Sequence, residues 1–264
     1  MGYLKGKNVI ITGASSGIGL EVARILIREY GCTVLATGRS REKLEKCRLE
    51  LGEKYLTYSF DVSLEAEWIK FADYLKGLEI KFNVLINNAG VMPPFGKITR
   101  QETADKIKVI ETDFLSCVYG VDHLLGVLEG DKGVVNVSSS SALCPVMGQG
   151  TYSAAKVALK AYTEVLWAES EFYVGLIMPG VCQTDIFRSA NPNEKEKGLI
   201  GKIATKPHRC AKRIVRAVNR KRKRRIIGLD ARLMRMLHFF FPKRAAKIIG
   251  WFLKKSGLKL FADM

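Results

Sequence analysis

Residues 9–19 read VIITGASSGIG, an apolar run that leads directly into a glycine-rich segment. The β-branched residues at the start of this stretch predict a buried strand. Apolar residues then recur at helical spacing, at Ile18, Val22, Ile25 and Leu26. A strand, a glycine turn and a helix in this order are typical of a dinucleotide site. The glycines let a pyrophosphate approach the backbone, and the first amides of the helix bind its charge. The residues expected to bind a cofactor here are Gly13, Ser15, Ser16, Gly17, Ile18 and Gly19.

The same rhythm continues along the chain. Further apolar runs that predict strands occupy residues 33–37, 55–60, 83–86, 133–137, 174–178 and 225–227, and helical patterns separate most of them. Strands that are continuously apolar and alternate with helices predict a parallel sheet covered on both faces. We therefore expect an α/β fold with one doubly wound Rossmann domain over residues 1–228. A basic, helical extension should follow over residues 229–264.

The second predicted strand ends at Gly38-Arg39-Ser40, about 20 residues beyond the last glycine of the turn. An acidic residue at this distance would bind the free ribose hydroxyl of NAD. A guanidinium suits the extra phosphate of NADP(H), which an acid would repel. Arg39 therefore favours NADP(H) as the cofactor. The alternative is an ordinary surface arginine at the start of a helix, as Arg41, Lys43 and Lys46 are expected to be.

Polar and small residues stand where other predicted strands end. They are Asp61, the run Asn87-Asn88-Ala89-Gly90, the four serines from Ser138 to Ser141, and the pair Pro179-Gly180. Ligands of open parallel sheets bind at the carboxyl ends of the strands, so these residues should converge on one crevice. Tyr152 and Lys156 follow in a helical pattern, and their spacing of four places them on one helix face. The ammonium group should lower the pKa of the phenol, so that the pair can exchange a proton with a hydroxyl or carbonyl oxygen.

Taken in order, TGASSGIG, NNAG, a serine thirteen residues before a tyrosine, YSAAK and PG resemble the classical short-chain dehydrogenase/reductase family. The resemblance covers roughly residues 5–228. It implies a seven-stranded parallel sheet and hydride transfer between a nicotinamide cofactor and an alcohol or ketone. It implies that Ser139 binds the substrate oxygen, that Tyr152 is the general acid or base, and that Lys156 holds the nicotinamide ribose. It also implies assembly as a homodimer or homotetramer.

The resemblance assigns further cofactor contacts. Asp61 and Val62 match positions beside the adenine; Asn88, Ala89 and Gly90 match the segment beside the adenosine ribose; and Pro179, Gly180 and Thr184 match the loop over the nicotinamide amide. Ser138 is expected to be structural, because strand alternation points it away from Ser139. One departure is Asp113, which stands where the family often has an asparagine in a proton relay. An acid there would either alter the relay and the partner of Lys156, or have no catalytic role.

Composition sets broader limits. With 264 residues, 47% of them apolar, the chain can bury one large core. Its net charge of +17 is uneven, because residues 1–194 carry a balance of −2 and residues 195–264 a balance of +19. The six cysteines form no CxxC pair, and the three histidines have no close metal-ligating neighbour. We therefore expect free thiols, a cytoplasmic location and no metal site.

The C-terminal part carries the excess charge. Residues 220–225 are six consecutive cations, but no nucleic-acid recognition fold surrounds them, so we do not expect nucleic acid as a partner. Further on, Ala245, Ile248, Ile249, Phe252 and Leu253 share a helical face opposite Lys243, Lys247 and Lys254. Such a basic amphipathic helix is suited to peripheral contact with an anionic membrane. The alternative is that it caps the substrate pocket or packs on a partner subunit.

Together these observations predict an NADP(H)-dependent oxidoreductase that interconverts a secondary alcohol and a ketone on a small apolar substrate, such as a hydroxysteroid. Residues 185–207 mix apolar and charged side chains and should cover that substrate. Two alternatives stay open. One is a membrane-surface reductase of 3-oxoacyl or sphingoid-type lipid chains. The other is a regulatory protein that binds NADP(H) without turnover.

Overall fold

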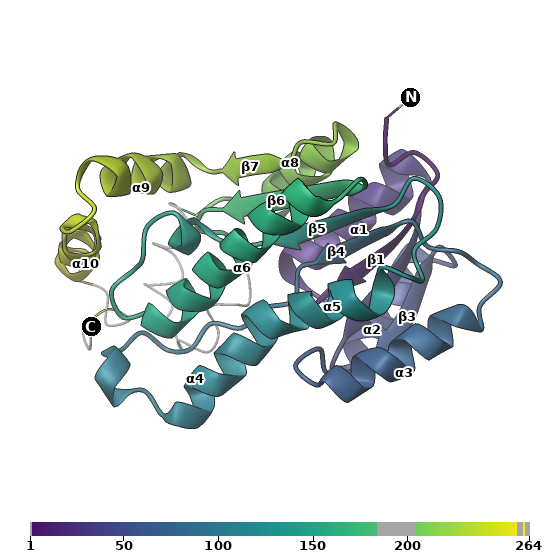
Figure 1. The fold of residues 1–264 in the computed structure, drawn as a ribbon, viewed down its shortest axis with the longest axis horizontal. Helices are drawn as coiled ribbons and strands as arrows, with labels where there is room; N and C mark the ends of the chain where they lie inside the picture. Colours follow the sequence, from purple (N-terminus) through teal and green to yellow (C-terminus); the bar gives the residue numbers. More distant parts are fainter. Residues whose placement is uncertain (1, 184–203, 258–260, 262–264) are drawn as a thin grey trace.

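The computed structural model describes residues 2–183, 204–257 and 261 of the chain. Its centre is a parallel sheet (Figure 1). The strands are β1 (Asn8–Thr12), β2 (Thr33–Gly38), β3 (Tyr55–Ser59), β4 (Val84–Asn87), β5 (Gly133–Val137), β6 (Tyr173–Pro179) and β7 (Arg224–Ile227). Their order across the sheet is β3-β2-β1-β4-β5-β6-β7. The chain therefore builds outward from β1 in one direction and then from β4 in the other, which confirms the doubly wound topology.

The seven predicted strands are all present, each within one residue of its predicted ends. They could be predicted because strands buried on both faces are continuous apolar runs. Every residue of β5 and β6 is buried, for example. The neighbouring pair β4–β5 aligns Asn87 with Asn136, and the Asn87 side-chain amide donates to Asn136 Oδ1 at 2.8 Å. Asn136 Nδ2 donates in turn to Thr163 Oγ1 at 3.0 Å, so these buried amides link the two strands to the helix that carries Thr163 near the carboxyl end of the sheet.

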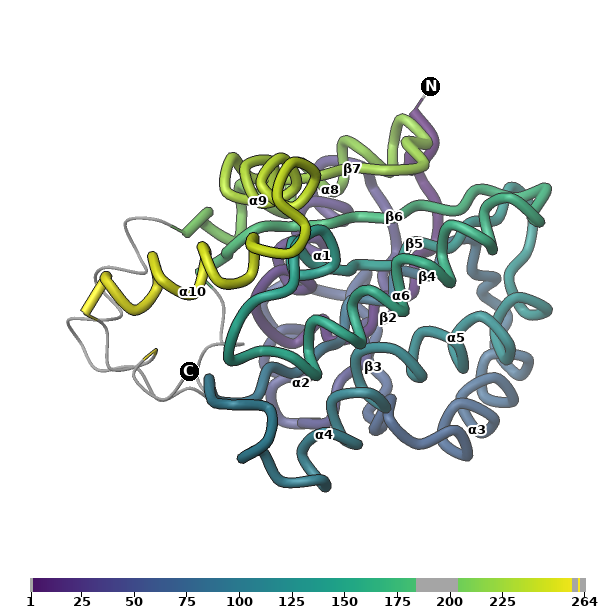
Figure 2. The backbone as a smooth tube through the Cα atoms, turned by 60° about the vertical axis from the view of Figure 1, so that its left-hand side comes forward, coloured from purple at the N-terminus to yellow at the C-terminus, as the bar shows by residue number. Residues whose placement is uncertain are grey.

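Helices cover both faces of the sheet (Figures 1 and 2). One face carries α1 (Gly17–Tyr30), α2 (Arg41–Leu51) and α8 (Pro207–Asn219); the other carries α3 (Glu65–Lys76), α4 (Thr103–Ile110), α5 (Ser116–Leu124) and α6 (Gly150–Glu169). A π-helical turn, Glu111–Leu115, joins α4 to α5, and short 3-10 turns occupy Ile98–Arg100 and Ser140–Ala142. The helices cover the two faces of the sheet and leave the carboxyl ends of its strands accessible.

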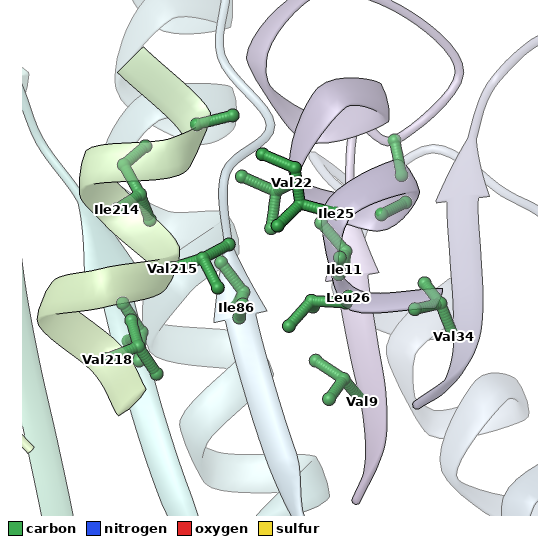
Figure 3. Packing of buried hydrophobic residues seen from close by; sticks show 14 of the residues in the cluster. Val9, Ile11, Val22, Ile25, Leu26, Val34, Ile86, Ile214, Val215 and Val218 are labelled. Atoms are coloured by element: carbon green, nitrogen blue, oxygen red, sulfur yellow. The ribbon is translucent and has the colours of Figure 1, made fainter. Parts of the chain in front are cut away.

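Packing between α1, α8 and the sheet forms the larger part of the core (Figure 3). Figure 3 shows Ile214 and Val215 of α8 and Val22 of α1 pointing into the layer that also holds Ile11 and Ile86 of the strands. All five side chains are buried. Burying an aliphatic side chain of this size contributes about 1.5–3 kcal/mol relative to leaving it exposed. This contribution holds α1, and so the glycine turn at its start, against the sheet.

Two more helices, α9 (Leu229–Phe240) and α10 (Ala245–Lys255), follow β7 and lie at the carboxyl end of the sheet (Figure 1). Gly228 has a φ of 113°, in the region that favours glycine, and turns the chain from β7 into α9. Among the described residues, no helix is both long and apolar enough to cross a bilayer.

Candidate active site

The glycine turn after β1 brings two loops into close contact. Gly13 and Gly17 have φ angles of 67° and 57°, which other residues rarely adopt. A side chain at Gly13 would lie 2.9 Å from the Ala89 Cα, and one at Gly19 would collide with the Asn88 amide. The Ser16 side chain makes no capping hydrogen bond to α1, so it leaves the first amides of the helix to a ligand. The turn is therefore built for close approach of an anion.

Thr12 holds the second loop against this turn. Its Oγ1 accepts hydrogen bonds from the backbone N–H groups of Asn88 and Ala89, both at 3.0 Å. The Asn88 side-chain amide donates in return to the Thr12 carbonyl oxygen at 2.9 Å. Sequence reasoning did not single out Thr12. Its position at the end of an apolar strand, directly before the first glycine, is the signal that could have identified it.

A cavity of about 900 Å³ opens at the carboxyl ends of the strands. The predicted site residues that line it are Gly13, Ser15, Ser16, Gly17, Ile18, Arg39, Asp61, Val62, Asn88, Ala89, Gly90, Ser139, Tyr152, Lys156, Pro179 and Gly180. Gly19 does not line the cavity and instead packs beneath it, against Gly13 and Asn88. Thr184 lies outside the described residues. One crevice therefore collects residues from seven segments of the chain, although their individual roles stay predictions.

At one end of the cavity, two cations flank the start of α2. Arg39 and Lys43 both line the cavity, together with Ser40 between them. The Ser40 hydroxyl caps α2 by accepting from the Lys43 backbone N–H at 3.2 Å. Lys43 is exposed, as expected of a surface residue, and the first turn of the capped helix also brings it to the cavity. Arg41, in contrast, does not line it.

The four serines after β5 have different surroundings. Ser139 Oγ accepts a hydrogen bond from the Ser141 backbone N–H at 3.2 Å and caps the short 3-10 turn. Ser138 Oγ donates to the Lys156 carbonyl oxygen at 3.0 Å, in a buried position. Ser138 therefore fastens the strand end to α6, whereas Ser139 lies close enough to Tyr152 for its side chain to lower the pKa of the phenol. Ser138, Ser140 and Ser141 are buried, whereas Ser139 is only partly buried, so exposure separates Ser139 from the other three serines.

Tyr152 and Lys156 lie one turn apart on α6, and both are buried. The Lys156 Nζ lies 5.7 Å from the centroid of the Tyr152 ring and 2.9 Å from Asp113 Oδ1. The second Asp113 oxygen accepts the Val91 backbone N–H at 3.0 Å. Asp113 belongs to the π-helical turn, which bulges toward Gly90, where an added Cβ would lie 2.7 Å from Asp113 Oδ1. The acid at this position therefore partners the lysine directly.

Burial and neighbouring charges set the ionisation of this group. Burial raises the pKa of Tyr152; the charge of Lys156 and the hydrogen bond with Ser139 lower it, the charge of Asp113 raises it, and the net pKa is above its ordinary value. Burial also raises the pKa of Asp113, against the opposing effect of Lys156. For Lys156, burial lowers the pKa, but the charges of Asp113 and Tyr152 outweigh it and the net pKa is raised. Lys156 was expected to lower the pKa of the phenol. It does lower that pKa, but burial and Asp113 outweigh this effect.

Comparison with known proteins agrees with this geometry. The family model described as short chain dehydrogenase matches residues 7–195. This chain is a short-chain dehydrogenase. An uncharacterized oxidoreductase of Bacillus subtilis, YxnA, is 31% identical over 260 residues, which cover 93% of this chain and 72% of the relative. The 3-beta-hydroxysteroid dehydrogenase of Comamonas testosteroni is 30% identical over 205 residues, 75% of this chain and 79% of that one.

Solved structures of the family share the fold. A short-chain dehydrogenase/reductase from Burkholderia phymatum in complex with NAD superposes with a TM-score of 0.79 at 21% identity, covering 91% of this chain and 95% of that one. The closed form of a serine dehydrogenase complexed with NADP+ gives a TM-score of 0.73 at 22% identity, with 84% and 94% covered. Short-chain dehydrogenases therefore bind either nicotinamide cofactor on this fold, and the family alone does not choose between them.

The cavity wall also contains residues that were not among the predicted site residues. Apolar side chains from the C-terminal helices form part of its wall: Met234 of α9, Ile249 and Leu253 of α10, and Phe261 beyond them. Gln149 is buried, lines the cavity, and donates from Nε2 to the Pro93 carbonyl oxygen at 2.8 Å. No group of His, Cys, Asp or Glu within residues 2–183, 204–257 and 261 is arranged to hold a metal ion.

Proposed function

We propose that this short-chain dehydrogenase is an NADP(H)-dependent oxidoreductase that interconverts a secondary alcohol and a ketone on an apolar substrate. The observation that carries the proposal is the grouping of Ser139, Tyr152 and Lys156 on the wall of the same cavity as the glycine turn. A nicotinamide dinucleotide spans a turn of this kind and the sheet edge beside it. Among the described residues, Tyr152 is the only tyrosine on the cavity wall. The carbonyl group of a bound ketone would then lie near it.

The three side chains divide the chemistry of ketone reduction. NADPH supplies the hydride to the carbonyl carbon when it is bound. Tyr152 donates its phenolic proton to the carbonyl oxygen, and the Ser139 hydroxyl donates a hydrogen bond to the same oxygen as negative charge develops there. Lys156 carries a positive charge beside the ring and stabilises the phenolate that remains. Alcohol oxidation is the reverse, with the Tyr152 phenolate accepting the hydroxyl proton.

The charges at the start of α2 support NADP(H) over NAD(H). Arg39 and Lys43 would both contact the extra phosphate on the adenosine ribose, and Ser40 adds a hydroxyl. The amino end of the 11-residue helix α2 favours the same negative charge. Within the described residues, no acid lines the cavity at the end of β2, where one would bind a ribose hydroxyl of NAD.

The cavity wall near the tyrosine supports an apolar substrate. Met92, Phe95, Met234, Ile249 and Leu253 present hydrophobic side chains to it. A ring system or chain of secondary-alcohol type would bury its apolar surface against these groups, which favours hydroxysteroid-like substrates among the possible classes. The 3-beta-hydroxysteroid dehydrogenase among its relatives supports the same choice. The predicted covering segment, residues 185–207, lies outside the described residues as far as residue 203.

Incubation of the purified protein with a panel of apolar ketones and either NADPH or NADH tests the proposal. We expect oxidation of NADPH that depends on a ketone, with steroid ketones among the best substrates. Binding of NADPH without turnover of any ketone, or of any alcohol in the reverse direction, would instead support a regulatory protein that only binds the cofactor.

A further inference from the structure

The helix α9 turns an apolar stripe toward solvent. Leu229, Leu233, Met236 and Phe240 are spaced four, three and four residues apart, so they lie along one side of the helix. Their exposed fractions are 56–72%. Single exposed apolar residues are common on protein surfaces, but a continuous stripe over three turns of helix is a mark of an interaction site.

The other side of α9 is fixed to the enzyme. Ala231 is fully buried, and Met234 lines the cavity. Asp230 Oδ2 accepts the Val181 backbone N–H at 2.7 Å, which ties the start of the helix to the loop after β6. The helix cannot turn its stripe inward without breaking this hydrogen bond and opening the cavity wall.

The apolar face predicted for α10 is divided in the structure. Ala245 is buried, and Ile249 and Leu253 turn toward the cavity, so this part of the face forms the cap of the substrate pocket. Phe252 was expected on the same face but is 62% exposed, and Trp251 beside it is 55% exposed. The Lys255 Nζ lies 4.8 Å from the centroid of the Trp251 ring. One side of α10 therefore covers the pocket while the other presents aromatic rings and cations to solvent.

The charge around these exposed residues is of one sign. From residue 231 to residue 262 the sequence holds eight Lys and Arg residues and no Asp or Glu. Arg232 and Arg235 stand on the exposed part of α9 beside the stripe, and Lys247, Lys254 and Lys255 are exposed on α10. This face, defined by the exposed residues of α9 and α10, is called the C-terminal face below.

We propose that the C-terminal face binds the surface of an anionic lipid bilayer. Cations that flank exposed apolar and aromatic side chains match the phosphate layer and the acyl boundary beneath it, and tryptophan is enriched at that depth. A second copy of this chain fits the face less well, because a symmetric contact would bring two sets of cations together. Since α9 and α10 also wall the cavity, docking would place the pocket next to the source of an apolar substrate.

Co-sedimentation of the full-length protein with vesicles tests the proposal without depending on enzyme activity. Vesicles of phosphatidylcholine are compared with vesicles that also contain phosphatidylglycerol, each at low and high salt. We expect binding to the anionic vesicles that weakens as salt rises, because salt screens exposed charges. Arg232→Gln and Arg235→Gln should each weaken binding about fivefold. The double change Leu233→Gln and Met236→Gln should weaken it by about tenfold or more.

A matched control separates this face from general stickiness. Leu49 on α2 is 77% exposed, so Leu49→Gln removes a leucine that is more exposed than Leu233 and should leave vesicle binding unchanged. Thermal denaturation of each variant confirms that it is folded. The proposal is overturned if the protein binds neither vesicle, if it binds both equally at all salt concentrations, or if Leu49→Gln has the larger effect. It is also overturned if the wild type is an oligomer that the stripe variant dissociates and that does not bind vesicles.

Discussion

The Lys156 Nζ lies 2.9 Å from Asp113 Oδ1, and the two side chains are 4% and 0% exposed. Two charges that are buried from solvent interact more strongly than the same charges would at the protein surface. The carboxylate compensates much of the ammonium charge that would otherwise stabilise the Tyr152 phenolate, and its own charge raises the pKa of Tyr152. The phenol is thereby kept in its protonated form, which is the form that donates a proton in ketone reduction.

Asp113→Asn should move the pH profile of the enzyme toward lower pH. The change removes a negative charge that raises the pKa of Tyr152, so that pKa falls. Oxidation needs the phenolate and rises as pH rises through this pKa, whereas reduction needs the phenol and declines there. Both limbs should therefore shift downward by roughly one pH unit or more. The measurement is kcat/KM for alcohol oxidation and for ketone reduction as a function of pH.

Asp105→Asn provides the matched control for this shift. Asp105 is an exposed residue of α4 that also lines the cavity but makes no ion pair with Lys156. Its loss should leave the pH profile in place. Equal profiles for wild type and Asp113→Asn would mean that the ion pair does not set the ionisation of the tyrosine.

The cations at the start of α2 should determine cofactor choice. Arg39→Asp should reverse the preference from NADP(H) to NAD(H), because it replaces a phosphate contact with repulsion. Lys43→Gln should lower NADPH affinity about tenfold and leave NADH affinity unchanged. Arg41→Gln, the neighbouring cation outside the cavity, should change neither affinity. Titration of cofactor binding for the three variants is the measurement, and unchanged selectivity in Arg39→Asp would refute the assignment.

The serines at the end of β5 should separate into one that acts on substrate and one that holds structure. Ser139→Ala should lower kcat by roughly 100-fold, the scale observed when one donor to a developing oxyanion is removed. Ser138→Ala should lower the free energy of unfolding by about 1 kcal/mol, because it loses the hydrogen bond to Lys156, while kcat falls much less. Ser140→Ala should affect kcat little. If Ser140→Ala proved the most damaging, the choice of Ser139 would be wrong.

The sequence was sufficient to predict those features for which the fold requires a recognisable local pattern of residues. The strands were predictable because both of their faces are buried, so that β1 and β5, for example, carry their own apolar signal. The glycine turn was predictable because a φ of 67°, as at Gly13, strongly favours glycine. Equally, the residues at strand ends were expected at one crevice, since the carboxyl ends of parallel strands share an edge.

The sequence could not predict which side chains contact each other or line the cavity once the helices are packed. Lys43 has the same local pattern as Arg41, and the difference between them arises only when the capped helix α2 is docked beside the cavity. The same limit applies to α10, where periodicity places Phe252 and Ile249 on one face although only Ile249 lines the pocket. The effect of Asp113 likewise depends on the π-helical turn that carries its carboxylate to Lys156.

Asp230→Ala should loosen the attachment of α9 to the site. It removes the acceptor of the Val181 N–H, a hydrogen bond to a charged group, and should lower the free energy of unfolding by about 1.5–3 kcal/mol. Because Val181 and Met234 line the cavity, KM for the ketone should rise more than kcat falls. Asp230→Asn keeps an acceptor oxygen and should recover most of both losses. Equal damage in the two variants, measured by chemical denaturation and kinetics, would contradict this role.

In the proposed reaction, Tyr152 delivers the proton to a ketone that NADPH reduces in this cavity. The most direct measurement compares wild type and Tyr152→Phe in ketone-dependent NADPH oxidation, with NADPH affinity titrated in the same preparations. Tyr152→Phe should bind NADPH almost as the wild type does but should turn over roughly 100-fold or more slowly. Equal turnover by the two proteins would contradict this prediction, as would a loss of activity fully explained by a loss of NADPH binding.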